Sequence, residues 1–235
     1  LNVVEYLIQE HDLRHKIHDH IKKVGDIERL ISKVATARVN PRELKQIQLS
    51  LYAIEGIKNT CSIKGNKEFG KISKNLNPCR ELADTLSKQL KDEPPLLVNK
   101  GNIIANGVND ELDELRNISS SAKNYLQKIL EREIKRTNIS SLKIGFNNVF
   151  GYYLEVTHAH KEKVPDDWHR KQTLTGSERY ITEELKELED KILGAQEKII
   201  SLEQKLYDEV VQHAAKYVST IQINSNVIAE LDCLS

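Results

Sequence analysis

The first part of the chain has the hydrophobic pattern of a small helical bundle. Between residues 3 and 91, apolar positions recur at spacings of three and four, which gathers them on one face of successive helices. The clearest helix start is Asn40, because Asn can cap a helix, Pro41 suits the first helical position and Glu43 can reach back to the cap N–H. The pattern therefore predicts a helix over residues 41 to 59.

A proline pair and a turn signal mark the end of this bundle. Pro94 and Pro95 oppose helix continuation, because proline disfavours the helical conformation of the residue before it. The run Asn99-Lys100-Gly101-Asn102 is typical of a turn. We therefore expect a linker over residues 92 to 107.

Two long amphipathic helices are predicted next, over residues 109 to 136 and 182 to 217. Each carries one narrow apolar stripe with alternating spacings of three and four, which is the pattern of paired helices. The stripe positions are Leu115, Ile118, Ala122, Tyr125 and Ile129 in the first helix, and Leu185, Leu188, Ile192, Ala195, Ile199, Leu202 and Leu206 in the second. As antiparallel partners they would form a rod on the order of 40 Å long, at about 1.5 Å per residue.

Between the two helices, the spacing of apolar residues changes from the period of a helix to the alternation of a strand. Leu142, Ile144 and Phe146 alternate with polar residues or glycine, and a second alternating run follows at residues 152 to 156. This predicts a β-hairpin. Residues 170 to 175 alternate again and predict a further strand, with Gly176 turning the chain toward the second helix. The expected fold is mainly α: a helical bundle with long antiparallel helices that carry a small antiparallel β subdomain.

Charge gives little support for nucleic-acid binding by the chain as a whole. Lys plus Arg and Asp plus Glu both number 35, so any contact with phosphates must be local. Residues 140 to 181 contain six basic and five acidic side chains. A hairpin can bring Lys143, Arg170 and Lys171 to one face, but from these residues alone a merely solvated polar face is the favoured interpretation.

The sequence lacks the motifs of common catalytic sites. It contains no phosphate-binding G-x-x-x-x-G-K-[ST] loop, no G-x-S-x-G and no H-E-x-x-H, so we expect no catalysis. His11, His15 and His18 could share a helix face, but a closed zinc site needs four ligands, so we expect no metal. The three cysteines show no C-x-x-C spacing, which favours a reduced, cytoplasmic setting.

No membrane segment or export signal is expected either. No run approaches the roughly 20 apolar residues that a membrane span needs, and the N-terminus has no signal-peptide pattern. The chain has no Met and opens inside an apolar periodic run, which indicates a segment of a longer protein.

Several short segments, in this order, resemble one known family. Those that resemble the clamp of the bacterial MutS family are Gly145-Phe146-Asn147, Gly151-Tyr152-Tyr153, Arg170-Lys171-Gln172-Thr173-Leu174 and Glu178-Arg179-Tyr180-Ile181 with Glu184-Leu185-Lys186. Those that resemble the family's core and lever are Gly25-Asp26-Ile27-Glu28-Arg29-Leu30, Ala37-Arg38, Asn40-Pro41-Arg42 with Leu44, Gly107, Glu111-Leu112-Asp113-Glu114-Leu115-Arg116 and Ala229-Glu230-Leu231-Asp232. The resemblance covers essentially the whole chain.

The resemblance implies part of a homodimeric DNA mismatch repair protein that encircles DNA and works with MutL. In this family, levers join an ATPase to a clamp that grips the DNA backbone. The mismatch-reading wedge and the nucleotide-binding loop lie outside these residues, so this part should neither find mismatches nor hydrolyse ATP. It should hold no cofactor, because ATP and Mg belong to the ATPase domain.

The resemblance also implies a domain division. Residues 1 to 122 would form the first part of the core and lever, residues 123 to 190 the clamp with a β-rich tip at about 140 to 181, and residues 191 to 235 the returning lever helix. We expect the segment alone to be a monomer and the whole protein to be cytoplasmic and associated with the nucleoid.

The implied partner is the double-stranded DNA backbone, contacted by a small set of clamp residues. These are Lys143, Asn147, Arg170, Lys171, Thr175, Gly176 and Ser177. The sequence departs from the family directly before Glu178-Arg179-Tyr180. The family usually has Lys-Asn-Ala there, whereas this chain has Thr175, Gly176 and Ser177. A charge-assisted phosphate contact is therefore missing at Thr175, and hydroxyls, backbone N–H groups, Lys171 and Asn147 would have to compensate.

Two alternatives remain open at the level of sequence. One is a purely structural coiled-coil scaffold whose β tip contacts protein, and the balanced charge favours it. The other is a MutS paralogue that does not read mismatches and works on DNA junctions or stalled ribosomes.

Overall fold

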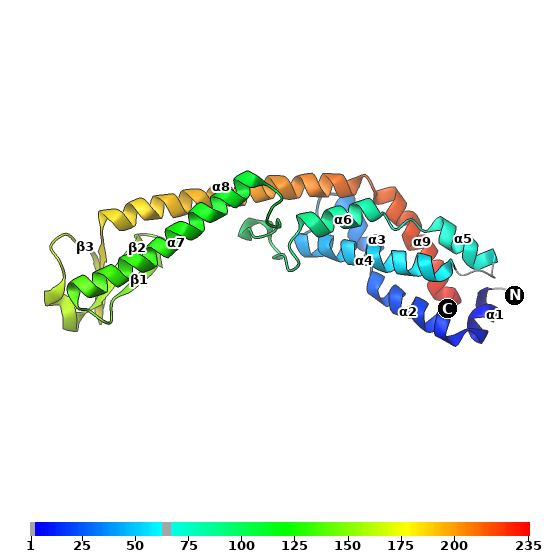
Figure 1. Ribbon diagram of the computed structural model, residues 1–235, viewed down its shortest axis with the longest axis horizontal. Helices are drawn as coiled ribbons and strands as arrows, with labels where there is room; N and C mark the ends of the chain where they lie inside the picture. Colours follow the sequence, from blue (N-terminus) through cyan, green and yellow to red (C-terminus); the bar gives the residue numbers. More distant parts are fainter. Residues whose placement is uncertain (1–2, 63–66) are drawn as a thin grey trace. The chain divides into compact units, whose positions relative to one another are not determined.

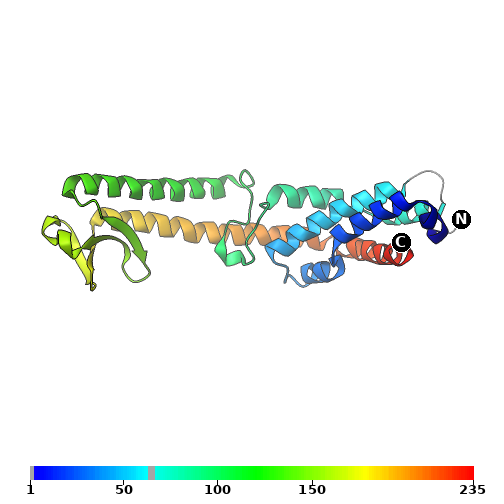
Figure 2. The ribbon, with the colours of Figure 1, turned by 90° about the horizontal axis from the view of Figure 1, so that it is seen from below.

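The computed structural model describes residues 3–62 and 67–235, and its chain divides into two compact units (Figures 1 and 2). The bundle unit consists of residues 1–108 together with 202–235, and the sheet unit consists of residues 109–201. The long helix α8, Glu183–Ala215, contributes residues to both units. The fold is mainly α with one small antiparallel sheet, as the sequence predicted.

The predicted bundle is confirmed. Its helices within the predicted residues are α1 (Val3–Gln9), α2 (His11–Val24), α3 (Ile27–Ala35), α4 (Pro41–Cys61), α5 (Lys67–Asn75) and α6 (Arg80–Gln89). Helix α9 (Val218–Leu234), which the bundle prediction did not include, packs against α2, α3 and α5. Helix α4 packs against α2, α3, α5 and α6 and buries a row of apolar side chains among them. Its start is the predicted capping box: Asn40 accepts from the Glu43 N–H at 3.0 Å, and the Glu43 carboxylate accepts from the Asn40 N–H at 3.1 Å.

The segment predicted as a linker, residues 92–107, has little regular secondary structure, and part of it packs onto the bundle unit. Ile103 and Ile104 are fully buried, and Ile104 forms an antiparallel bridge with Leu90. A short 3-10 helix, η1, covers Val98–Lys100. The linker prediction was based on prolines and turn residues and did not consider the apolar pair Ile103–Ile104.

The two long helices of the prediction are α7, Asp110–Thr137, and α8. Asn109 caps α7 by accepting from the Leu112 N–H at 2.9 Å, and Asn138 ends it in the left-handed conformation. Within the sheet unit α7 and the first part of α8 run antiparallel (Figures 1 and 2). Their facing side chains form one apolar cluster, whose helical members are Ala122, Leu126, Ile129, Leu185, Leu188 and Ile192.

The apolar stripes were only partly right. On α7, the predicted stripe residues Ile118 and Tyr125 do lie toward α8, and the Tyr125 hydroxyl donates to Glu184 at 3.0 Å. Each is nevertheless 45% exposed, whereas Leu126, outside the predicted stripe, is buried. In the bundle unit, the buried positions of α8 include Glu203 and Tyr207 in place of the predicted Leu202 and Leu206, which are half-buried. The buried face of α8 is therefore set by the bundle, where Tyr207 donates to the Val39 carbonyl at 2.8 Å.

The β subdomain is a four-stranded antiparallel sheet with the order β1-β2-β4-β3. Its strands are β1 (Lys143–Asn147), β2 (Gly151–Thr157), β3 (His169–Thr173) and β4 (Ser177–Ile181), with a 3-10 helix η2 (His158–Lys163) after β2. The hairpin and third strand are confirmed. Strand β4 was missed: Gly176 lies in the turn between β3 and β4 rather than leading to the helix, which begins at Glu183.

One face of the sheet packs on the helices of the same unit. Leu154, Val156, Trp168 and Tyr180 belong to the apolar cluster that also contains the α7 and α8 side chains. At the other end of β2, the carboxylate of Glu189 from α8 accepts from the Tyr152 backbone N–H at 2.8 Å. The sheet is therefore attached to α8 both by apolar packing and by a charge-assisted hydrogen bond.

Candidate nucleic-acid interface

Strand register places the charged residues of the sheet on two different faces. Lys143, Glu155, Arg179 and Gln172 are successive cross-strand partners and form one row across the outer face. The neighbouring row, on the face toward the helices, contains Ile144, Leu154, Tyr180 and Arg170. Two predicted DNA-binding residues, Lys143 and Arg170, therefore belong to opposite faces.

Arg179 is fixed at the centre of the outer face. Its guanidinium lies 4.4 Å from the centre of the Tyr153 ring and donates to Gln172 at 2.9 Å and to Glu155 at 3.3 Å. The Tyr153 ring in turn covers Gly145, where an added Cβ would lie 2.6 Å from the ring. Arg179 and Tyr153 thus stabilise the sheet, and Tyr153 is a packing residue, as its buried position shows.

The cations of this sheet outnumber its carboxylates. The four strands contain Lys143, Arg170, Lys171 and Arg179 but only Glu155 and Glu178. Both carboxylates are paired, Glu155 with Arg179, and Glu178 with Arg170 and Lys161. Lys143 and Lys171 are exposed and form no ion pair with any residue in 3–62 or 67–235. The exposed, uncompensated charge of the sheet is therefore positive.

Lys171 lies on β3, two residues before the strand ends at Thr173. The register of these strands shifts between Arg170 and Gln172, so Lys171 occupies a bulge on an edge strand. Thr175 and Gly176 follow in the turn, and both are exposed. Lys171, Thr175 and Gly176 are thus all exposed along residues 171–176, the end of β3 and the turn that follows it, which we call the β3–β4 corner.

The structure separates the other predicted contacts from this corner. Asn147 pairs with Gly151 at one end of β2, whereas Ser177 pairs with Thr157 at the other end. Six residue steps along a strand correspond to about 20 Å, so Asn147 and Ser177 cannot contact one phosphate. Ser177 itself is only 8% exposed.

Arg170 is held by a buried carboxylate. Glu178 accepts from the Tyr180 hydroxyl and from Lys161 and Arg170, whose nitrogens lie 3.3 and 3.5 Å from it. The Tyr180 hydrogen bond, followed by the two cations, holds the pKa of Glu178 below its ordinary value of 4.5. Burial and the same carboxylate raise the pKa of Tyr180 to about 12. Glu178 thus remains ionised and keeps the Arg170 side chain on the helix-facing side.

The interpretation of the sequence missed several residues that build this site. Arg179, Glu178 and Glu189 stood in or near the segments that resemble the family, but no role followed from their spacing. His158 carried no signal at all. Their roles depend on strand pairing and on contacts between β4, β2 and α8, which become visible only once β4 is placed.

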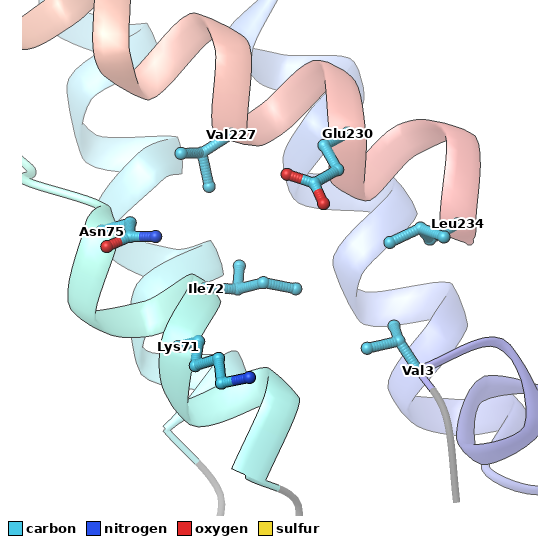
Figure 3. A pocket seen from close by; sticks show the side chains of 7 residues that line it. All are labelled: Val3, Lys71, Ile72, Asn75, Val227, Glu230 and Leu234. Atoms are coloured by element: carbon cyan, nitrogen blue, oxygen red, sulfur yellow. The ribbon is translucent and has the colours of Figure 1, made fainter.

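Outside the sheet, the described residues of the bundle unit form one further pocket of note. A pocket of about 370 Å³ in the bundle unit is lined by Val3, Lys71, Ile72, Asn75, Val227, Glu230 and Leu234 (Figure 3). Its polar members are exposed at the surface rather than gathered in a buried centre. Within the described residues, no group of three or more His, Cys, Asp or Glu side chains could hold a metal ion. No described helix is long and apolar enough to cross a membrane.

Comparison with known proteins identifies relatives over the full length of the chain. Residues 107–198 match the model of MutS family domain IV. Three proteins named DNA mismatch repair protein MutS are similar to the whole chain: those of Bacteroides fragilis (53% identical over 234 residues), Cytophaga hutchinsonii (51% over 234) and Christiangramia forsetii (48% over 234). Each alignment covers 100% of this chain but only 27% of the relative. The chain thus spans about a quarter of the length of these relatives.

Proposed function

Because the chain belongs to the MutS family, we propose that its sheet unit binds the backbone of duplex DNA without reading the base sequence. The observation that carries this proposal is the charge arrangement of the sheet. Its carboxylates are paired within the fold, while Lys143 and Lys171 remain exposed and unpaired among the described residues. Phosphate contacts of this kind position a protein on DNA but carry no sequence information.

The proposed DNA contacts form one main group at one end of the sheet and a second group at a distance from it. Lys143, Lys171, Thr175, Gly176 and Ser177 lie toward the same end of the sheet, with Lys143 and Lys171 on opposite edges. Three strand spacings separate these edges, or about 14 Å. Asn147 would meet a second backbone position, and Arg170 would act mainly by holding Glu178. The expected binding is weak, micromolar or poorer, because only a few phosphates are neutralised.

Continuity of α8 supports a further role in coupling. This helix runs from the end of the sheet, at Glu183, into residues of the bundle unit without a break. In the longer protein, a nucleotide-dependent movement at an ATPase domain would reach the clamp through this helix. We propose that the ATPase with its ATP and Mg, the contacts of a homodimer and the binding of MutL all belong to other parts of that protein.

Fluorescence anisotropy with labelled duplexes tests the proposal. The 235-residue chain should bind a perfect duplex and one with a single mismatch equally, with a log–log salt slope of about −2 if both lysines neutralise a phosphate. Lys171→Gln should reduce that slope by about 0.9. Lys128→Gln, which changes an exposed lysine of α7 instead, is the matched control and should leave the slope unchanged. A preference for the mismatch, or binding indifferent to salt, would contradict the proposal.

A second candidate function is a protein-binding scaffold, and a groove between α7 and α8 favours it. The groove has a volume of about 680 Å³, and its lining includes the exposed Ile118 and Tyr125. An apolar groove between two helices is a common binding site for an amphipathic helix of a partner protein. If Ile118→Glu abolishes binding of a protein partner while Lys171→Gln leaves DNA binding intact, the scaffold is the better description. A MutS paralogue that does not read mismatches would retain the same backbone binding.

A further inference from the structure

One side chain outside the predicted site organises the β3–β4 corner. The backbone N–H of His158 donates to the Gly176 carbonyl at 3.3 Å, and its ring Nε2 lies 3.0 Å from the Leu174 carbonyl. Leu174 completes the turn by donating its N–H to the Ser177 carbonyl at 2.8 Å. His158 is therefore hydrogen-bonded to two carbonyl oxygens of the turn, those of Leu174 and Gly176.

The backbone N–H groups of the same turn are left available. Those of Thr175 and Gly176 form no hydrogen bond with any described residue, and both residues are exposed. Exposed backbone N–H groups without an internal acceptor are available to donate to phosphate oxygens. The Thr175 hydroxyl belongs to the same turn, and Lys171 is an exposed cation of the strand that leads into it. The two N–H groups and the hydroxyl can donate hydrogen bonds to the oxygens of a DNA phosphate, as backbone N–H groups and hydroxyls commonly do.

The hydrogen bond also determines the protonation pattern of the His158 ring. A carbonyl can only accept, so Nε2 must carry the proton in the neutral ring, which leaves Nδ1 bare. When the ring gains a proton, Nδ1 becomes a second donor while the bond to Leu174 is kept. Protonation thus adds a full positive charge and a new N–H beside the turn without dismantling it.

We propose that His158 positions the phosphate-binding turn of the β3–β4 corner and, when protonated, becomes a cationic contact to the same phosphate. This inference rests on the proposed binding of the DNA backbone and adds to it a residue and a pH dependence. Histidine is the side chain whose charge changes between pH 5 and 8. Binding to duplex DNA is therefore accompanied by proton uptake and strengthens as the pH falls.

Most charged groups packed around His158 already form ion pairs or hydrogen bonds with other residues. Helix η2, which His158 begins, packs against β2 and β4. The charged groups of these strands are Glu155, Glu178 and Arg179, and all three are already paired. Within η2, the other titratable groups are His160, Lys161, Glu162 and Lys163; Lys161 pairs with Glu178, and Lys163 donates to the Asn138 carbonyl. Glu162 forms no ion pair with the described residues, so Glu162→Gln is needed as a control.

The test measures the affinity of the 235-residue chain for a labelled homoduplex at pH 8 and pH 5.5. For the natural chain, affinity should rise by about two- to fivefold as the pH falls, which is the range of one exposed ion pair, and the salt slope should steepen by up to about 0.9. His158→Gln can still donate to Leu174, so it should keep the affinity at pH 8 but show no rise. His158→Ala should bind more weakly at both pH values and show no rise either.

Two further variants separate this role from general effects. His169 begins β3, opposite Ile181 at the far end of the sheet, so His169→Ala should keep the full pH dependence. Glu162→Gln should also keep it, because the proton is stabilised by the DNA phosphate rather than by this carboxylate. Fluorescence of Trp168, the one tryptophan of the chain and a buried residue of the sheet unit, reports whether each variant is folded.

The possible results distinguish this inference from the proposed function. If the natural chain fails to bind duplex DNA at either pH, the proposed function is wrong and this inference fails with it. If it binds with a pH-dependent rise that persists in His158→Ala, DNA binding stands and the role of His158 is overturned. If His158→Gln is as weak as His158→Ala at pH 8 while remaining folded, the positioning role is overturned.

Discussion

Replacing Gly151 with alanine should destabilise the sheet unit by about 2–5 kcal/mol. Gly151 begins β2 with a φ of +74°, a conformation that costs an L-residue about 1–2 kcal/mol. An added Cβ would also overlap the carboxylate of Glu189. That carboxylate would move, because it is the end of a flexible side chain, and the Tyr152 N–H would lose the acceptor that now lies 2.8 Å away. An amide left without its partner costs about 1–3 kcal/mol.

The two contributions can be separated by a double-mutant cycle. In a Glu189→Ala background the hydrogen bond is already lost, so Gly151→Ala should cost only the backbone strain of about 1–2 kcal/mol. Gly176→Ala is a matched control in the same sheet, because Gly176 has no positive φ and nothing lies within 4 Å of the added Cβ. It should change the free energy of unfolding by less than about 0.5 kcal/mol.

Urea unfolding followed by Trp168 fluorescence is the appropriate assay. The chain forms two compact units, so a signal from the whole chain would mix two transitions. Trp168 is 5% exposed and lies in the apolar cluster of the sheet unit, so its emission reports on that unit alone. Equal costs for Gly151→Ala with and without Glu189 would refute the proposed contact. A cost as small as that of Gly176→Ala would refute the argument from positive φ as well.

Three further predictions concern stability. Arg132 holds the pKa of Glu184 below its ordinary value of 4.5, and Arg136 holds that of Asp167 below 3.8. The two ion pairs therefore stabilise the fold above these pH values, and this stabilisation is lost as the pH falls through the folded-state pKa values. Acid titration of Trp168 emission should show the loss, and a urea midpoint that stays the same from pH 6 to pH 3 would contradict it. Leu126→Ala should lower the free energy of unfolding of the sheet unit by about 2–5 kcal/mol, whereas Ile118→Ala, at an exposed position, should lower it by less than about 1 kcal/mol. Equal urea midpoints for the two variants would show that Ile118 is buried as the predicted stripe had it. Asn40→Ala should cost the bundle unit about 1 kcal/mol. Far-UV circular dichroism measures it once the sheet-unit transition, known from Trp168 fluorescence, is separated from the signal, and an unchanged bundle transition would mean that the capping box contributes nothing.

Local patterns in the sequence were sufficient where neighbouring residues decide the structure. The capping box at Asn40, the starts of α4 and α7, the β1–β2 hairpin and strand β3 all follow from spacings within a few residues. The same is true of the mainly α fold with a small sheet. These features depend on helix capping, on side-chain period and on turn chemistry, which act between residues close together in the chain.

The tertiary structure decided what depends on partners distant in sequence. Strand β4 was missed because its run is short and ends directly before a helix, and its place at the centre of the sheet depends on pairing with both β2 and β3. The exposure of Ile118 and Tyr125 depends on how far α8 covers α7. The partition of Lys143 and Arg170 between opposite faces, the separation of Asn147 from Ser177 and the contact of His158 with the β3–β4 turn all follow from strand register. Register shifted by one residue would exchange the two faces, and that choice is made by the packing of the whole sheet on its helices.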